Sequence, residues 1–202
     1  MSNTAEFFYD LSSPWTRIAF ANFGKAIEGK DIAVTWKPIL VGGVFNAVNE
    51  SVYESRKNPD NPKFRLNFVW LKEWAGLAGV AMNFPSAYHP VKSVNAMRFA
   101  CALEKDQAAL VRFSEAAFEA YFTDQRNIDD LDVLEEIATA CGLNGPVLRT
   151  AAASEDCKQR LRRNTQEAID RGAFGSPTIF IDGTYMYFGN DQLPLVMQRL
   201  GL

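Results

Sequence analysis

The stretch FFYDLSSPW, residues 7–15, joins an aromatic run to the start of a helix. Residues 6–10, EFFYD, have the composition of a short strand. Ser13 suits the N-cap of a helix because its hydroxyl can accept a hydrogen bond from a free backbone N–H group, and Pro14 suits the first helical position. Apolar residues then recur at helical spacing as far as Gly29. The sequence therefore predicts a strand followed by a helix that begins at a pair of serines.

Three more strands are predicted, one nearby and two close to the C-terminus. In residues 32–37, larger apolar residues alternate with smaller or polar ones, which is the period of a strand. Residues 178–181 and 184–188 are strand-like runs on either side of Asp182-Gly183. An Asp-Gly pair favours a hairpin turn in which both central residues have positive φ. The chain is thus expected to open β-α-β and to close with a hairpin.

The central part of the chain has a different pattern. Residues 42–63 contain several Gly, Asn and Pro residues and are predicted as a loop. From there to about residue 172 the apolar spacing is helical, and a further helix is predicted at about 191–200. Ser154 is expected to cap the last helix of the central block. Two α/β parts would then assemble one small sheet, with a helical domain inserted between them.

Composition excludes several classes of protein. The chain has 202 residues, 48% hydrophobic and 22% charged, as in an ordinary globular protein of one or two domains. A net charge of −3 argues against general nucleic-acid binding. No apolar run reaches the roughly 20 residues of a membrane span, so no membrane partner is expected. The first residues lack a basic start followed by an apolar stretch, so no secretory signal is predicted and a cytoplasmic location is expected.

Cysteine and histidine usage excludes further sites. Cys101, Cys141 and Cys157 have neither metal-site nor redox-motif spacing, and are expected to be buried, inert thiols. The single histidine, His89, leaves zinc sites without ligands, so no metal is expected. Neither a GxSxG elbow nor a phosphate-binding glycine loop occurs.

The helix start at Ser12-Ser13 could also carry chemistry. A helix N-terminus presents unpaired N–H groups and a partial positive charge, so it stabilises an anion such as a thiolate. The chain has no cysteine there, so the thiol would come from a ligand, and the Ser13 hydroxyl could donate a hydrogen bond to it. The local pattern by itself fits a plain helix cap equally well.

Two further segments allow both a structural and a functional interpretation. Gly175-Ser176-Pro177 precedes a predicted strand; a cis Ser176–Pro177 bond would turn the Ser176 backbone toward an extended peptide-like ligand, whereas a trans bond would make an ordinary turn. Asn190 or Asp191 reads as an N-cap of the last helix, and Asp191 could instead accept a hydrogen bond from a ligand ammonium group.

Taken together, the motifs resemble one family. In chain order they are FFYDLSSPW, LVGGVFNAVN, FP at 84–85, SVNAMR at 93–98, GAFGSPT and FGND. This combination resembles the 2-hydroxychromene-2-carboxylate isomerases and kappa-class glutathione transferases, which are thioredoxin-like proteins of the DsbA type. The resemblance implies an α/β protein with a thioredoxin-like domain at 1–45 and 173–202 and a helical insertion, linkers included, at 46–172.

The resemblance also implies a site and a cofactor, glutathione. Ser13 matches the family's catalytic serine. The positions implied to bind glutathione are Asn49, Lys63, Ser176, Pro177, Gly189, Asn190 and Asp191, and Tyr88 matches a position near the organic substrate. Trp15 is a further candidate for the substrate site, where it could supply an apolar wall, although an isolated residue of this type is also typical of a core. The sequence departs from the family at Gln192, where arginine is frequent, and at Thr16-Arg17, where aromatic residues are usual.

The activity implied is that of a glutathione-dependent isomerase. Reversible addition of the glutathione thiolate to a conjugated system would allow a double bond to rotate, and would link 2-hydroxychromene-2-carboxylate to trans-o-hydroxybenzylidenepyruvate or serve a related step of aromatic degradation. Two alternatives stay open: a kappa-like glutathione transferase or peroxidase, and a glutathione- or peptide-binding module without catalysis. The partner expected is a small aromatic substrate, and a homodimer is left open.

Overall fold

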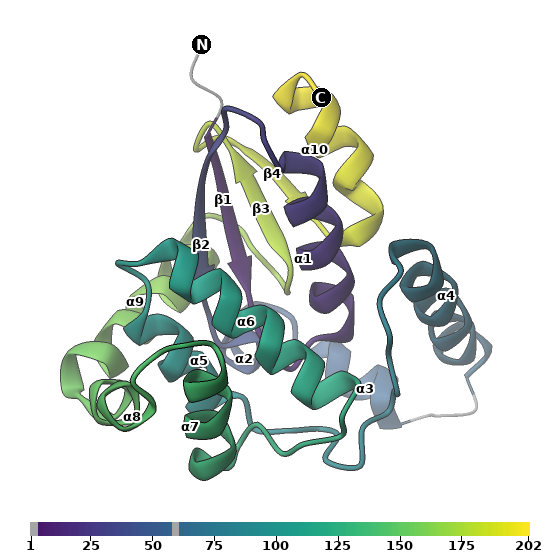
Figure 1. Cartoon of the computed structure of the whole chain (residues 1–202). Coiled ribbons are helices and arrows are strands. Elements are labelled where there is room, and N and C mark those ends of the chain that lie inside the picture. The colour runs from purple at the N-terminus through teal and green to yellow at the C-terminus, as the bar shows by residue number, and fades with distance from the viewer. Residues whose placement is uncertain (1–3, 58–60) are drawn as a thin grey trace.

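The computed structural model describes residues 4–57 and 61–202, except for the side chains of residues 55–57 and 63–64. In these residues a mixed sheet has the strand order β2-β1-β3-β4. Its strands are β1 (Thr4–Tyr9), β2 (Ala33–Pro38), β3 (Thr178–Ile181) and β4 (Tyr185–Phe188). Strand β1 is parallel to β2 and antiparallel to β3, and β3 is antiparallel to β4. Segments from both ends of the chain therefore meet at β1 (Figure 1).

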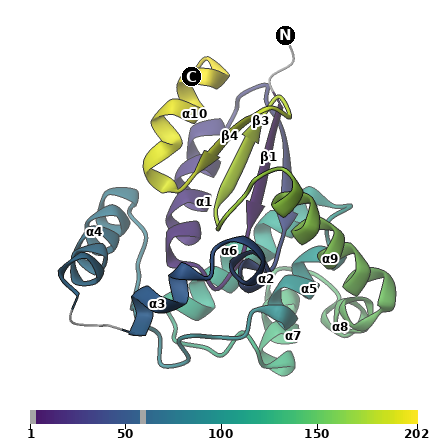
Figure 2. The ribbon, with the colours of Figure 1, turned by 180° about the vertical axis from the view of Figure 1, so that it is seen from behind.

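In the sequence, most of the helices fall between strands β2 and β3. They are α1 (Pro14–Ile27), α2 (Val41–Val48), α3 (Ser51–Lys57), α4 (Pro62–Ala78), α5 (Val94–Ala102), α6 (Gln107–Phe122), α7 (Leu131–Ala140), α8 (Gly145–Ala153), α9 (Glu155–Asp170) and α10 (Leu193–Leu200). A one-turn 3-10 helix, η1 (Asn190–Gln192), precedes α10. Figures 1 and 2 show α1 and α10 on one side of the sheet and α9 on the other.

Strand β1 is buried on both faces of the sheet, and its side chains alternate between the two faces. Phe7 and Tyr9 pack into the large core, together with residues of α1, α5, α6 and α10. Phe8 points to the opposite face, where a smaller core with Phe180 is covered by α2 and α9. The aromatic run of β1 therefore anchors the layers on both sides.

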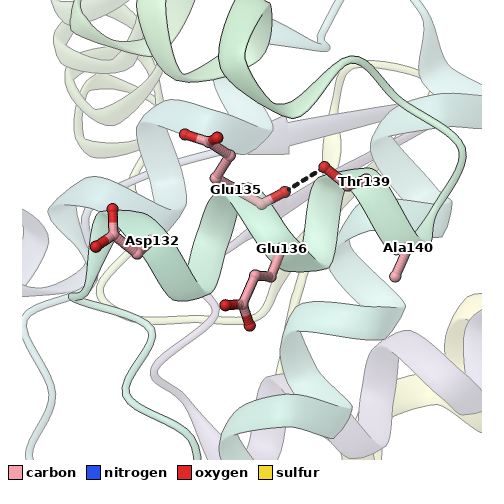
Figure 3. A pocket seen from close by; sticks show the side chains of 5 residues that line it. All are labelled: Asp132, Glu135, Glu136, Thr139 and Ala140. Carbon is pink, nitrogen blue, oxygen red and sulfur yellow. Dashed lines mark hydrogen bonds between the residues drawn. The ribbon is translucent and has the colours of Figure 1, made fainter.

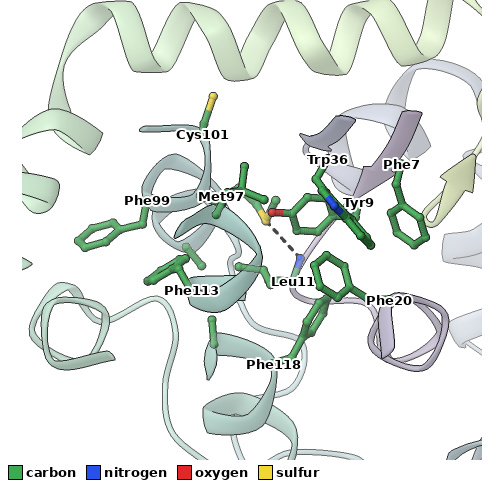
Figure 4. Packing of buried hydrophobic residues seen from close by; sticks show 14 of the residues in the cluster. Phe7, Tyr9, Leu11, Phe20, Trp36, Met97, Phe99, Cys101, Phe113 and Phe118 are labelled. Atoms are coloured by element: carbon green, nitrogen blue, oxygen red, sulfur yellow. Dashed lines mark hydrogen bonds between the residues drawn. The ribbon is translucent and has the colours of Figure 1, made fainter. Parts of the chain in front are cut away.

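The large core contains aromatic rings from β1, α1, β2, α5 and α6 (Figure 4). The Trp36 ring lies 4.8 Å from the Phe7 ring and 4.2 Å from the Phe20 ring, between centroids. On the other side, the Leu11 N–H group donates to the Met97 sulfur at 3.2 Å. This contact brings α5 against the loop that leads from β1 to α1, so the core supports the region of Ser13.

The predicted hairpin and the helix caps at Ser13 and Ser154 are confirmed. The N-cap predicted at Asn190 or Asp191 is wrong, because these residues form η1 and Gln192 precedes α10. Asp182 and Gly183 have φ of 50° and 68°, and the Thr184 N–H group donates to the Ile181 carbonyl oxygen at 3.1 Å. Ser154 accepts a hydrogen bond from the Cys157 N–H group and caps α9. These elements follow from local chemistry alone.

The loop predicted at 42–63 is wrong, because α2 and α3 occupy most of it. Gly42 and Gly43 weaken the local helical signal, but the Val41 N–H group at the start of α2 donates to the buried Asp10 carboxylate at 2.8 Å. A carboxylate beside a helix N-terminus stabilises the helix. Val44 is buried in the smaller core. The start of α2 is thus fixed by a distant partner, and the expected division after residue 45 falls inside this helix.

The predicted helical block is also interrupted. Residues 79–93 and 123–130 connect helices without helical structure of their own. Within the described residues, none of the helices combines the length and apolarity needed to cross a membrane.

Candidate functional site

Ser13 is the N-cap of α1, as predicted. Its hydroxyl oxygen accepts a hydrogen bond from the Thr16 N–H group at 3.2 Å, and Pro14 occupies the first turn. The same hydroxyl donates to the Ser176 carbonyl oxygen at 3.3 Å. The first turn of α1 contains no acidic residue. A half-buried hydroxyl therefore lies at the positive end of a 14-residue helix.

The peptide before Pro177 lies against this helix start. The Ser176–Pro177 bond is cis, which is the conformation that the family resemblance implies. The Ser176 hydroxyl lies 2.8 Å from the Thr16 hydroxyl and accepts from the Asp10 N–H group at 3.0 Å. Among the described residues, no group accepts a hydrogen bond from the Ser176 N–H group. The segment is held by its side chain and leaves a backbone donor unused.

A buried carboxylate, Asp10, organises the loop around Ser13. Its Oδ1 atom accepts from the N–H group and the hydroxyl of Ser12, both at 2.8 Å. Its Oδ2 atom accepts from the Val41 N–H group at 2.8 Å and from the Ser93 hydroxyl at 3.0 Å. Burial raises the pKa of Asp10, while these four donors act in the opposite direction. Asp10 therefore joins the starts of α1, α2 and α5.

Sequence reasoning missed Asp10 and Thr16 as parts of the site. Asp10 has a local signal, since an acidic residue directly after an aromatic strand must find partners if that strand is buried. Thr16 is the third residue after the Ser13 cap. The hydroxyl groups of Ser13 and Thr16 both form hydrogen bonds with Ser176. Their partners are distant in the sequence, and no local pattern identifies them.

Asn49 lies next to the segment that contains Ser176. Its side-chain amide donates to the Phe174 carbonyl oxygen at 2.9 Å, and its Oδ1 atom accepts from the Ser51 hydroxyl at 2.9 Å. The end of α2 is thus bonded to the backbone of Phe174, two residues before Ser176. The side chain of Lys63, also expected to contact glutathione, lies outside the described residues.

The segment between β4 and α10 contacts the peptide around Pro177 through Gly189. Its N–H group donates to the Pro177 carbonyl oxygen at 3.1 Å, and its φ is 96°. Asp191 is exposed, and the Gln192 side-chain amide donates to its Oδ2 atom at 3.1 Å. Gln192 therefore supports Asp191 at the position where the family frequently has arginine.

Asn190, which precedes Asp191 in the same segment, has a buried side chain. It is only 2% exposed, and its Oδ1 atom accepts from the Asn22 side chain of α1 at 3.0 Å. Its Nδ2 atom is buried without a hydrogen-bond partner in the described residues. The turn of η1 directs this side chain beneath α1, so Asp191 is the exposed member of the pair.

The two residues expected near an organic substrate differ in their exposure to solvent. Trp15 is half-buried in an apolar cluster that joins α1 to α4 and includes Ile18 and Phe84. Tyr88 is 47% exposed in the stretch between α4 and α5. Next to it, the His89 ring packs against Phe84 with centroids 4.7 Å apart. Trp15 and Phe84 can therefore form a common apolar wall, whereas Tyr88 faces solvent.

A separate surface depression lies along α7 (Figure 3). It has a volume of about 510 Å³ and is lined by Asp132, Glu135, Glu136, Thr139 and Ala140. Its three carboxylates form ion pairs with Arg149 or Arg126. None of the expected site residues lines it, so the acidic run has the solvated, ion-paired character of a helix surface.

Comparisons with known proteins agree with the fold. A family model described as "DSBA-like thioredoxin domain" matches residues 4–201. A 2-hydroxychromene-2-carboxylate isomerase of Pseudomonas putida is 24% identical over 202 residues, which cover 97% of this chain and 93% of that protein. Glutathione S-transferase kappa 1 of Rattus norvegicus is 27% identical over 207 residues, covering 97% and 90%.

A solved structure is similar over nearly the whole length. The structure of a 2-hydroxychromene-2-carboxylate isomerase superposes with a TM-score of 0.81 at 24% identity, covering 98% of this chain and 94% of that one. The predicted DsbA-type thioredoxin fold is therefore confirmed. Because the family model spans almost all residues, the chain belongs to the family of DSBA-like thioredoxin domains.

Proposed function

We propose that this protein is a glutathione-dependent isomerase acting on 2-hydroxychromene-2-carboxylate or a related aromatic intermediate. The observation that carries the proposal is the Ser13 hydroxyl, which lies at the N-terminus of α1 beside the peptide before Pro177. In that place a hydroxyl can donate to a thiolate, but it cannot exchange disulfides. The thiol must therefore come from a ligand.

The residues around Ser13 fit a peptide-like thiol. The Ser176 N–H group donates to no described residue, so it is available to the backbone of an extended ligand. Asp191 is exposed close by and can accept from an ammonium group, such as that of a γ-glutamyl residue. Asn49 holds the Phe174 carbonyl oxygen and so keeps this segment in position. We propose that these residues orient glutathione with its sulfur toward Ser13.

Bound glutathione would supply a thiolate that adds to a conjugated carbon and later leaves it, so that a double bond can rotate. The role of the chain is to favour that thiolate. The Ser13 hydroxyl would exchange its 3.3 Å hydrogen bond to the Ser176 carbonyl oxygen for one to sulfur. The dipole of α1 adds to this effect. Each unit by which the pKa of the bound thiol falls corresponds to about 1.4 kcal/mol in favour of the thiolate.

The related proteins support the same chemistry. Relatives with the isomerase name and with the transferase name both align over 97% of the chain. We also propose a cytoplasmic location, because the cytosolic glutathione pool is kept reduced.

The direct test is a pH titration of the thiolate absorbance of glutathione bound to the wild type, to Ser13→Ala and to Ser12→Ala. We expect the thiol pKa to be lowered in the wild type and in Ser12→Ala, and to return toward its free value in Ser13→Ala. The Ser12 hydroxyl bonds to Asp10, so this variant is a matched control for the loss of a neighbouring hydroxyl. Binding with no shift of the thiol pKa in the wild type would contradict the proposal and indicate a binding module without catalysis.

A second candidate function is a kappa-like transferase or peroxidase. The rat transferase kappa is 27% identical to this chain, against 24% for the isomerase of Pseudomonas putida, so identity favours neither activity. The same Ser13 site would serve both, and the organic pocket would decide between them. Turnover of a chloronitrobenzene, measured beside turnover of the chromene, distinguishes the two activities.

A further inference from the structure

Arg17 is a buried cation without an ionic partner in the described part of the chain. It is 8% exposed. Its Nη2 atom donates to the Ala81 carbonyl oxygen and to the Thr123 hydroxyl, both at 2.8 Å. Glu119 and Asp124 act on it only through longer-range attraction, which is weaker than the cost of burial, so the pKa of Arg17 is lowered. Buried charges are normally paired, whereas this guanidinium forms no ion pair with a carboxylate among the described residues.

The guanidinium also has unused donors. An arginine side chain has five N–H donors, and the two contacts of Nη2 use two of them. Its Nε atom is buried with no partner, and Nη1 makes no hydrogen bond to a described residue. The protein encloses Nε completely, whereas Nη1 is not buried to that extent. Nη1 is therefore the donor that an anionic ligand could reach, and a guanidinium N–H forms a strong, charge-assisted hydrogen bond to a carboxylate.

The position of Arg17 links it to the site. It lies one helical turn after Ser13, and its N–H group donates to the Ser13 carbonyl oxygen at 3.1 Å. Its guanidinium lies 5.9 Å from the centre of the Phe122 ring, and the Phe122 ring lies 6.0 Å from the Phe84 ring. Phe84 belongs to the same apolar cluster as Trp15. A cation thus adjoins an aromatic wall next to the candidate serine.

We propose that Arg17 binds the carboxylate of an aromatic substrate and so selects anionic compounds over neutral ones. The inference rests on the proposed function, because it assigns one group of the substrate to one residue of that site. A guanidinium is well suited to a carboxylate, since it stays charged and offers several donors in one plane. Arg17 is thereby a specificity-determining residue, separate from the glutathione contacts.

A purely structural role would have different consequences. If Arg17 served only to bridge residues Ala81 and Thr123, its replacement would weaken the binding of acids and neutral compounds alike. Thr123→Val provides the matched control, because it removes one acceptor of Nη2 and keeps the charge. Arg17→Met removes the charge with a side chain of similar length, and Arg17→Lys restores a cation.

The test is calorimetric binding, without glutathione, of 2-hydroxycinnamate and of its methyl ester to the wild type and to the three variants. We expect the wild type and Thr123→Val to bind the acid about 10- to 100-fold more tightly than the ester, the range of a charge-assisted hydrogen bond. Arg17→Met should bind both compounds with the affinity that the wild type has for the ester. Arg17→Lys should recover part of the preference.

Two results would overturn the inference: equal affinities of the wild type for acid and ester, or an equal loss of both in Arg17→Met. If Arg17→Met does not fold, as judged by circular dichroism, the wild-type ratio and the Arg17→Lys ratio decide. A separate titration with glutathione tests the proposed function alone. Failure of glutathione to bind would reject that function, whereas a wild-type preference for the acid would still support the role of Arg17.

Discussion

The hydroxyl of Thr16 lies 2.8 Å from the hydroxyl of Ser176, and the contact is buried. It fastens the first turn of α1 to the peptide before Pro177, although 160 residues separate the two in the chain. The same Ser176 hydroxyl accepts from the Asp10 N–H group at 3.0 Å. The relative position of Ser13 and the proline segment therefore depends on one small group of buried hydrogen bonds.

Thr16→Val should lower the free energy of unfolding by about 1–2 kcal/mol, because it keeps the shape of the side chain and removes a buried hydrogen bond. Urea unfolding followed by circular dichroism measures this change. Thr184→Val is the control, since the Thr184 hydroxyl makes an exposed hydrogen bond to the Asp182 carbonyl oxygen. Equal stabilities of the two variants would show that the contact between Thr16 and Ser176 adds nothing.

Ser13→Cys should place a thiol with a lowered pKa at the N-terminus of α1, since the helix dipole favours the thiolate. We expect it to react with iodoacetamide faster near neutral pH than a free cysteine, and to gain thiol–disulfide exchange activity. Ser12→Cys is the matched control, one residue outside the cap. If both cysteines reacted at the same rate, the special character of position 13 would be refuted.

Gly189→Ala should weaken glutathione binding and stability together. The φ of 96° disfavours any side chain, and a Cβ atom would lie 2.7 Å from the Asp191 Oδ1 atom. Gly183→Ala is a matched control, because residue 183 has a φ of 68° with nothing within 4 Å of its Cβ position. We expect both variants to lose about 1 kcal/mol of stability. An increase in the Kd for glutathione is expected only for Gly189→Ala; calorimetry that found the same Kd for both would exclude a role of Asp191.

Glu6 should make stability depend on pH. Burial alone would raise the pKa of Glu6, but Arg171 at 2.7 Å and Lys37 at 2.8 Å outweigh burial and lower it. A carboxyl group with a lowered folded-state pKa stabilises the fold above its unfolded pKa, and this contribution is lost as the pH falls through the folded-state value.

The measurement is the urea midpoint of the wild type and of Glu6→Gln from pH 7 down to about pH 3, a range that begins above the ordinary pKa of a glutamate and ends below it. We expect the wild type to be the more stable protein at pH 7 and the difference to shrink on acidification. Glu136→Gln, in an exposed pair with Arg126, should show a smaller effect at pH 7. A constant difference between the wild type and Glu6→Gln across the range would contradict the role of this cluster.

The parts of the fold that were predictable from the sequence are those fixed by neighbouring residues. The aromatic run before Ser13, the turn at Asp182-Gly183 and the cap at Ser154 each carry their own chemistry, and the structure has all three. The start of helix α2 is not fixed by neighbouring residues, because the N–H group of its first residue donates to Asp10, 31 residues earlier in the sequence. A pattern search along the chain cannot detect a cap supplied by another part of the fold.

The candidate site divides in the same way. Ser13 has a local signal, and the family resemblance points to Ser176 and Asp191. The surroundings of Arg17 have no such signal, because its acceptors lie 64 and 106 residues away in the sequence. Asn190 also has surroundings that no local pattern gives, since its buried side chain accepts a hydrogen bond from Asn22 of α1, 168 residues away in the sequence. Motifs identify positions, and packing decides which of them face a ligand.

Asp10 limits how this protein can be recombined with its relatives. Its carboxylate accepts hydrogen bonds from Ser12, from Val41 and from Ser93, which directly precedes α5. A chimera that exchanged the segment from α3 through α9 for that of another family member would have to bring a hydroxyl donor to position 93. Without a hydroxyl at position 93, the Asp10 Oδ2 atom would lose one of its donors. The exchange would then disturb the loop of Ser12 and Ser13, which lies outside the exchanged segment.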